Sequence, residues 1–372
     1  MVHLIPALTA AFLAFNVFAH GDVNKEILRR QAHLNHPERR SILDCKRSLV
    51  DSGWVREQHQ RREDRLHELR VEAGFAQAHE LVRRNPIEVE LSYGKKGACT
   101  LDPEQTEGPF YVSGELVRKN ILSGQIGPKA HVDINLIDVR NCMPIEGAYV
   151  ELWGTNVTGV YSGVQSTANG NGSPDFSSNA LRGIQPTNAD GTASFITLIP
   201  GHYGGRTNHL HSKTPHLHLY ASRLMILALV HHDAKLLPNN TIIGGTISHV
   251  GQFYFEQDFI NDLETFYPYT LNEQYHVFND QDSLFLYANK SDDDPFMKVS
   301  KIGKTYADGL YATIDVGINP HAIQNWTSPV GKWTSEGTVP DPDSVYAGWP
   351  RPVSAPESSP TPSPSPSASS SA

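Results

Sequence analysis

The chain has 372 residues, of which 39% are hydrophobic and 19% charged, and this ordinary globular composition excludes wholesale disorder. Lys and Arg number 31 against 40 Asp and Glu, and the net charge of −9 argues against a surface that binds nucleic acid. Beyond the first twenty residues, no apolar run approaches the roughly 20 residues that a membrane span requires.

The first segment, residues 1–19, is apolar and ends in small residues, which is typical of a signal peptide cleaved before His20. Sequons for N-glycosylation agree with that interpretation and lie at Asn156, Asn171, Asn239, Asn289 and Asn325. Together they predict a secreted, extracellular glycoprotein.

Residues 20–98 are rich in Arg and Glu and contain helical stretches and several dibasic pairs. One interpretation is a propeptide, or an arm that packs on a second copy of the chain in a homodimer. The other is a charged helix pair that caps the domain of its own chain.

From residue 99 to about residue 325 the pattern changes to short alternating runs separated by Gly, Pro and Asn, which is typical of β-strands. The predicted strands cover residues 132–139, 148–153, 194–199, 251–257 and 310–318. They predict a mostly β domain, an antiparallel sandwich or barrel.

Three cysteines are too few for a disulfide scaffold. Cys99 and Cys142 flank the first strand region, and in an oxidising compartment a bridge between them would fasten the start of the domain. This pairing leaves Cys45 of the charged arm unpaired, which suits a bridge to a second chain or a segment that is removed.

The last segment, residues 326–372, ends in a stretch rich in Pro and Ser that cannot bury a core. We expect a disordered tail that serves as an O-glycosylated stalk or spacer.

Histidine is unusually frequent: eight of the 18 histidines fall between His202 and His249. The densest motif is PGHYGGRTNHLH, in which His209 and His211 are two residues apart. On a strand such a pair points to the same face, about 6–7 Å apart at the backbone, which suits two imidazoles that bind one metal. Tyr203 and Arg206 precede them in a glycine-rich turn.

The motif contains no acidic residue, so the nearest anionic ligands are phenols. A phenol has a pKa near 10, and only a strongly Lewis-acidic ion holds it ionised at neutral pH. The ligand type therefore favours Fe(III) over zinc or calcium.

Several motifs occur in one order along about 220 residues: EGPFY (107–111), VEL followed after six residues by GVY (159–161), LRGIQPTNADG (181–191) and PGHYGGRTNHLH. This set resembles the intradiol ring-cleavage dioxygenases, in particular their fungal secreted branch. The resemblance implies a β-sandwich with one non-haem Fe(III), which opens catechol-type rings with O2 to muconate-type diacids.

Carried over residue by residue, the resemblance implies that the ferric ligands are Tyr161, Tyr203, His209 and His211. Tyr203 matches the tyrosine that leaves the iron when catechol binds, so it would accept a proton from a substrate hydroxyl. Arg206 matches the arginine that stabilises negative charge on the substrate.

The sequence departs from the family pattern at two places. Gly154 and Thr155 stand where this branch usually has His-Cys after the tryptophan. After His211, residues 212–229 intervene before the expected continuation of the strand, so we expect this stretch to break the strand. It is either a translated intron or a genuine insertion, and it contains a second pair, His216 and His218.

Two other functions remain open at this stage. A secreted β-sandwich binding module would follow if the departures have dismantled the metal site. A hydrolase with zinc on the histidines would leave both tyrosines protonated and the protein colourless.

Overall fold

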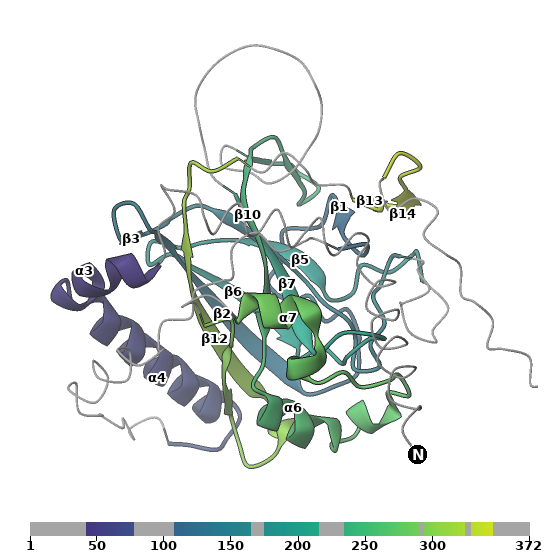
Figure 1. Cartoon of the computed structure of the whole chain (residues 1–372), viewed down its shortest axis with the longest axis horizontal. Helices are drawn as coiled ribbons and strands as arrows, with labels where there is room; N and C mark the ends of the chain where they lie inside the picture. The colour runs from purple at the N-terminus through teal and green to yellow at the C-terminus, as the bar shows by residue number, and fades with distance from the viewer. Residues whose placement is uncertain are drawn as a thin grey trace, which may run out of the picture.

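The computed structural model describes residues 42–77, 108–164, 175–215, 234–289, 294–323 and 329–344. The predicted signal peptide, Cys99 and the second histidine pair lie outside these residues. Within the described residues the protein is mostly β, with several sheets and few helices, as the sequence predicts (Figure 1).

The first sheet has four antiparallel strands and carries the histidine motif. Its order is β10 (Ile247–Tyr254), β7 (His209–Pro215), β4 (Tyr149–Trp153) and β5 (Arg182–Pro186). The predicted stretch 251–257 overlaps β10 only in part, because the strand begins earlier and a helix starts at Gln257.

The second sheet has the order β11 (Lys298–Lys301), β12 (Leu310–Ile318), β2 (Lys129–Asp138) and β3 (Met143–Pro144), and β6 (Thr192–Leu198) also pairs with β2. The predicted strands 132–139, 194–199 and 310–318 match its members closely. One pairing corrects the antiparallel prediction, since β2 and β12 run parallel.

The main core lies between these two sheets. Buried side chains from both meet in one cluster, among them Val132 and Ile134 of β2, Val150 and Leu152 of β4, and Phe253 of β10. At roughly 1.5–3 kcal/mol for each large apolar side chain, this burial is the main source of stability. The arrangement is that of a β-sandwich.

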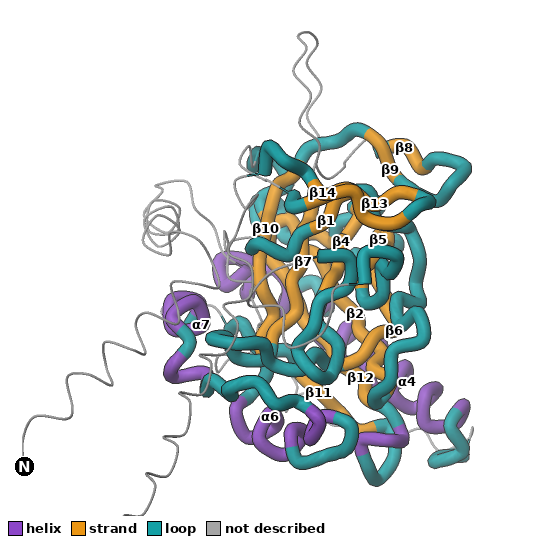
Figure 2. Tube along the Cα trace, turned by 90° about the vertical axis from the view of Figure 1, so that its right-hand side faces the viewer, coloured by secondary structure: helices purple, strands orange, loops and turns teal. Residues whose placement is uncertain are grey.

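A third, small sheet corrects the predicted boundary of the tail. It joins β1 (Val112–Ser113) in parallel to β13 (Gly331–Thr334), which forms a hairpin with β14 (Gly337–Pro340). Figure 2 shows these three strands together, below the short hairpin of β8 (Lys235–Leu236) and β9 (Ile242–Ile243). Regular structure therefore extends past residue 325. A side chain at Gly331 or Gly337 of this hairpin would clash with its surroundings.

The charged N-terminal segment packs on the β domain of its own chain. It forms η1 (Ile42–Cys45), α3 (Lys46–Asp51) and α4 (Trp54–Glu72), which lie on one side of the sandwich (Figure 1). Arg62 of α4 pairs with Asp315 of β12, and Arg70 donates hydrogen bonds to the carbonyl oxygens of Lys301 and Ile302, both at 3.2 Å. This packing supports the interpretation of a helix pair that caps the domain.

The disulfide prediction was wrong in its pairing. Cys45 is bonded to Cys142, across a sequence separation of 97 residues. Spacing along the chain suggested Cys99, but the packing of Ile42 and Leu49 against Ile137 brings Cys45 to the turn after β2. The arm is therefore covalently attached to the sandwich.

The sequence analysis expects residues 212–229 to break the strand that carries the histidines. The structure differs, because the strand does not stop at residue 212. β7 continues to Pro215, and Ser212 and Lys213 pair with both β4 and β10. The remainder of that stretch, 216–229, lies outside the described residues. The first residues after His211 thus supply strand pairing beside the histidine motif.

Among the described residues, five helical segments follow β10: α6 (Gln257–Glu264), η2 (Tyr269–Leu271), η3 (Asn279–Gln281), α7 (Ser283–Ala288) and η4 (Tyr306–Asp308). In Figure 1 the α6 and α7 helices lie on the same side of the sandwich. Among the helices that the structure describes, none combines the length and the apolar character needed to cross a membrane.

Candidate metal centre

Tyr161 follows a tight turn at the end of β4. The Asn156 carboxamide oxygen accepts hydrogen bonds from the backbone N–H groups of Thr158 and Val160, both at 3.0 Å, which is an Asx-type turn. Gly159 has a φ of +75°, and a side chain there would collide with the carbonyl oxygen of His202. The turn thereby places Tyr161 inside the protein, with 1% of its surface exposed.

His209 and His211 open strand β7, and both are buried. The period of two residues along a strand puts them on the same face, as the sequence predicts. His209 Nδ1 lies 2.6 Å from the carbonyl oxygen of Thr207. Donation of the Nδ1 proton to that oxygen makes Nε2 the nitrogen with the lone pair, an arrangement typical of histidines that bind metals.

The four predicted ligand atoms lie together in the structure. Tyr203 Oη is 3.4 Å from His209 Nε2, which is 3.2 Å from His211 Nε2, and that atom is 3.0 Å from Tyr161 Oη. Tyr161 comes from one loop, Tyr203 from another and the histidines from β7. The fold brings together two phenol oxygens and two imidazole nitrogens that are up to 50 positions apart in sequence.

Aromatic rings enclose these four side chains. Phe110 stacks on Tyr161 with ring centroids 4.4 Å apart and presents its face to the edge of Tyr203 at 5.2 Å. Trp153 stacks on His211 at 4.9 Å with nearly parallel planes. Phe110 of the EGPFY motif thus contacts both tyrosines, while its neighbour Tyr111 packs behind Trp153. The walls keep bulk water away from the donor atoms.

Arg206 is buried beside Tyr203, with its Nη1 3.4 Å from the phenol oxygen. Its Nε donates to Asp282 Oδ2 at 2.7 Å, and its Nη2 donates to Gln252 Oε1 at 2.7 Å. Nη2 also lies 3.1 Å from Tyr254 Oη. These contacts hold the guanidinium in one orientation, and the carboxylate of Asp282 balances its charge.

Burial shifts the pKa of three of these four side chains in the absence of a metal. It raises the pKa of Tyr203 to about 12, although the Arg206 guanidinium acts in the opposite direction. Burial also raises the pKa of Tyr161 well above its ordinary value, and it lowers the pKa of His211 well below 6.5 with the help of Arg206 and Arg182. Only a strongly Lewis-acidic cation would therefore ionise the phenols at neutral pH.

A cavity of about 420 Å³ lies beside the Tyr161 turn. Its lining includes Thr158, Val160, Tyr161, Asp175 and Glu273. Tyr203, Arg206 and the two histidines are not part of its lining. The cavity thus reaches the candidate centre from the Tyr161 side.

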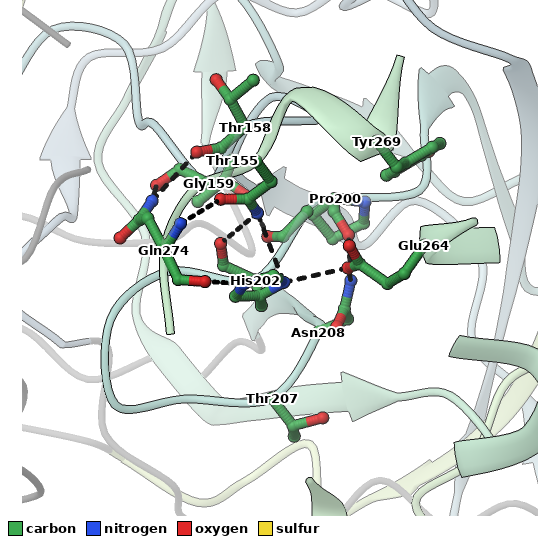
Figure 3. Close-up of polar contacts among 12 residues, drawn as sticks. Thr155, Thr158, Gly159, Pro200, His202, Thr207, Asn208, Glu264, Tyr269 and Gln274 are labelled. Carbon is green, nitrogen blue, oxygen red and sulfur yellow. Dashed lines mark hydrogen bonds and ion pairs between the residues drawn. The ribbon is translucent and has the colours of Figure 1, made fainter. Parts of the chain in front are cut away.

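A second group of potential ligands surrounds His202 and was missed by the sequence analysis. One donor atom each of His202, Glu264 and His276 lie within 4.8 Å of one another. Figure 3 shows the hydrogen bonds of His202: its Nδ1 is 3.0 Å from Glu264 Oε1, and its Nε2 is 2.9 Å from the Gln274 carbonyl oxygen. The rings of His202 and His276 stack with their centroids 4.7 Å apart.

The departure at Gly154 and Thr155 has a local explanation. A Cβ at Gly154 would lie 2.8 Å from the Leu210 side chain, so Leu210 would have to move to admit a larger residue there. The Thr155 hydroxyl instead donates to the Gly201 carbonyl oxygen at 2.6 Å. This bond links the loop that precedes Tyr161 to the loop that precedes Tyr203.

Asp282, Gln252 and Phe110 were also missed as site residues. Asp282 and Gln252 lie 76 and 46 positions from Arg206, and no local pattern marks them. Phe110 could have been predicted from the sequence, because it belongs to the EGPFY motif at residues 107–111.

No protein-family model matches the chain. The chain is 33% identical over 135 residues to catechol 1,2-dioxygenase 1 of Acinetobacter lwoffii, a match that covers 32% of this chain and 42% of that relative. An intradiol ring-cleavage dioxygenase from Tetranychus urticae is 28% identical, with a TM-score of 0.47, over 61% of this chain and 98% of the other. The catechol 1,2-dioxygenase from Pseudomonas arvilla C-1 is 16% identical, with a TM-score of 0.35, over 64% and 70% of the two chains.

The chain thus spans less than half the length of the curated relative that it matches. That sequence match supports the resemblance of this chain to the intradiol ring-cleavage dioxygenases.

Proposed function

We propose that the chain is a secreted, Fe(III)-dependent intradiol dioxygenase that cleaves catechol-type rings with O2 to muconate-type diacids. The observation that carries the proposal is the contact between two phenol oxygens and two imidazole nitrogens in one buried cluster, at 3.0 to 3.4 Å. The curated relative named for catechol 1,2-dioxygenase activity supports the substrate class.

The donor set fits iron in its ferric state. The two Nε2 atoms of His209 and His211 face one another at 3.2 Å, an arrangement that a shared proton or a bound cation makes favourable. Phenolate is a hard donor that suits Fe(III), whereas zinc would favour sulfur, imidazole or carboxylate. Bound Fe(III) would supply a Lewis acid that ionises phenols and draws electron density from a catechol substrate.

The residues around the cluster have separable roles. Tyr203 Oη would accept the proton of a substrate hydroxyl, since the adjacent Arg206 guanidinium stabilises the phenolate form of Tyr203. Arg206 would stabilise the charge that develops on the substrate oxygens, and its bond to Asp282 fixes its direction before substrate arrives. Phe110 and Trp153 would exclude water.

The overall reaction balances without a further reductant. Catechol and one O2 together contain every atom of the muconate-type diacid, and the bond that breaks is the one between the two hydroxylated carbons. A chain without a nicotinamide or flavin partner can therefore perform it.

The proposal of secretion rests on the apolar residues 1–19 and on the sequons. The Cys45–Cys142 disulfide is typical of an oxidising compartment and supports it. Asn239 and Asn289 are exposed and accessible to a glycan, whereas Asn156 is half-buried in the turn before Tyr161.

The test is a visible absorption spectrum of the purified protein with metal analysis of the same sample, followed by addition of catechol. A ferric-phenolate band that moves on addition of catechol, with a muconate-type product, is the expected result. Tyr161→Phe and Tyr203→Phe should each alter the band, and Tyr203→Phe should abolish turnover.

Tyr311→Phe provides a matched control, because Tyr311 is also a buried tyrosine but donates to Asp133 on the other sheet. Its spectrum should match that of the wild type. A colourless protein that contains zinc would favour the hydrolase, and a metal-free protein that still binds a phenolic ligand without turnover would favour the binding module.

A further inference from the structure

Gln274 lies between the two loops that carry the tyrosines. Its Nε2 donates to the carbonyl oxygens of Thr158 and Gly159, at 2.9 and 3.1 Å, just before Tyr161. Its Oε1 accepts the backbone N–H of Gly204 at 2.7 Å, just after Tyr203. One side-chain amide thus uses its donor end on one loop, as Figure 3 shows, and its acceptor end on the other.

The two loops are also in direct contact. The Gly201 N–H donates to the Asn156 carbonyl oxygen at 3.0 Å, and Gly159 approaches His202 so closely that a side chain there would overlap the His202 carbonyl. The Gln274 bonds lie at the ends of the loops nearest Tyr161 and Tyr203. Gln274 is therefore well placed to control the separation of the two phenols.

The backbone of Gln274 is itself held in place. His202 Nε2 lies 2.9 Å from the Gln274 carbonyl oxygen, and the other ring nitrogen of His202 is 3.0 Å from Glu264 Oε1. Glu264 also accepts from Asn208 Nδ2 at 2.9 Å, beside His209. The Asn272 side chain donates to the His202 carbonyl oxygen at 2.8 Å. These bonds connect the end of α6 to Gln274 through His202, and to the start of β7 through Asn208.

We propose that Gln274 is a positioning residue that fixes the Tyr161 loop and the Tyr203 loop relative to each other, with the Glu264–His202 pair holding Gln274 in register. This inference rests on the proposed function for its catalytic consequence, and on hydrogen bonds alone for its structural part. Gln274 would act through the two tyrosines, without contact with substrate.

Two substitutions separate the two ends of the amide. Gln274→Met keeps the length of the side chain and removes its three side-chain hydrogen bonds. Gln274→Glu keeps an acceptor for the Gly204 N–H but loses the donor, and its charge faces the Thr158 and Gly159 carbonyls. Gln60→Met is the matched control, because Gln60 lies exposed on α4 and bonds to Asp64.

The first measurement is hydrogen exchange of the metal-free proteins, which does not depend on activity. Gln274→Met should speed exchange in residues 156–161 and at Gly204, whereas Gln274→Glu should speed it in residues 156–161 and leave Gly204 protected. Gln60→Met should match the wild type in both segments. A melting curve on each variant establishes that the comparison is between folded proteins.

The second measurement is the visible spectrum and the kinetics after loading with iron. Gln274→Met should shift the ferric-phenolate band and lower kcat roughly 10- to 100-fold, the usual effect of removing a partner that orients metal ligands, with little change in KM. Unchanged exchange in both loops, with a spectrum and kcat equal to those of Gln60→Met, would overturn the proposal.

The two proposals fail separately. If wild-type protein takes up no iron and has no visible band, the dioxygenase function is wrong, while the exchange data still decide whether Gln274 joins the loops. If the wild-type protein is an active ferric enzyme, and the Gln274 variants exchange hydrogen in both loops at the wild-type rate, only the positioning role is wrong.

Discussion

Arg206 and Asp282 form a buried ion pair, with Nε and Oδ2 2.7 Å apart and at most 2% of either side chain exposed. Asp282 also accepts the backbone N–H groups of Leu284 and Phe285, at 2.9 and 3.2 Å, so it caps the start of α7. One carboxylate therefore orients the cation beside Tyr203 and fixes a helix to the site.

Replacement of Asp282 should destabilise the protein because it leaves a buried cation without its counter-charge. We expect Asp282→Asn to lower the free energy of unfolding by about 3 to 5 kcal/mol, the usual cost of breaking a buried ion pair from one side. Urea unfolding followed by tryptophan fluorescence measures it. Asp280→Asn, at an exposed position two residues earlier, should have almost no effect.

Arg206→Lys should impair catalysis while keeping the positive charge. The guanidinium contacts Tyr203, Gln252, Tyr254 and Asp282 simultaneously, and an ammonium group cannot reproduce that planar arrangement. On the proposed function we expect kcat to fall by about 10²- to 10³-fold. Steady-state oxygen uptake with catechol measures it.

Arg70→Lys is the matched control, since Arg70 binds two backbone carbonyls on the far side of the sandwich. Equal activity of the two lysine variants would contradict a role of Arg206 in charge stabilisation.

The Cys45–Cys142 disulfide should contribute strongly to stability, because it closes a long loop between the arm and the sandwich. For a separation of 97 residues, the chain-entropy argument gives a contribution of about 4 to 5 kcal/mol. Cys45→Ser with Cys142→Ser should lower the melting temperature, and the wild type under reducing conditions should match the double variant. If the wild type has the same melting temperature with and without reductant, the disulfide is not formed.

Glu115 should make stability depend on pH. It is buried 3.9 Å from Arg182, its oxygens have no hydrogen-bond partner among the described residues, and burial raises its pKa to about 8. In the unfolded chain this carboxyl ionises near pH 4.5, so between pH 4.5 and 8 the folded state binds the extra proton. Its contribution to stability therefore falls as pH rises through that window.

Glu115→Gln removes this dependence. We expect the variant to gain stability relative to the wild type as the pH is raised from 5 to 8, measured by urea unfolding at each pH. Glu336→Gln, at an exposed turn, should show a constant difference from the wild type. A constant difference for Glu115→Gln as well would mean that the carboxyl is ionised in the fold throughout.

Local patterns were sufficient for most strands and for the histidine pair. Alternation of apolar residues identified the strands that became β2, β4, β6 and β12, because a half-buried strand imposes a period of two on its own sequence. The same period put His209 and His211 on one face. The parallel pairing of β2 with β12 could not be predicted from a local pattern, since the partner of a strand depends on the topology of the whole domain.

The cysteine pairing and the tail boundary failed for the same reason. Cys99 seemed the partner of Cys142 from spacing, yet Cys45 reaches it because the apolar residues of η1 and α3 pack against Ile137. The β13–β14 hairpin has few apolar residues and is held by its pairing with β1, which lies over 200 positions away.

The sequence by itself determined the kind of chemistry: two imidazoles at a spacing of two, with tyrosines and an arginine nearby, limit the metals that such a site can bind. The tertiary structure alone decided which other residues surround these histidines, tyrosines and arginine. Asp282 lies beside Arg206 although the two are 76 positions apart in the sequence. Gln274 lies between the tyrosine loops although it is 70 positions from Gly204. Donor type is a property of a residue and can be read along the chain, whereas a distance between donors results from the packing of the whole domain.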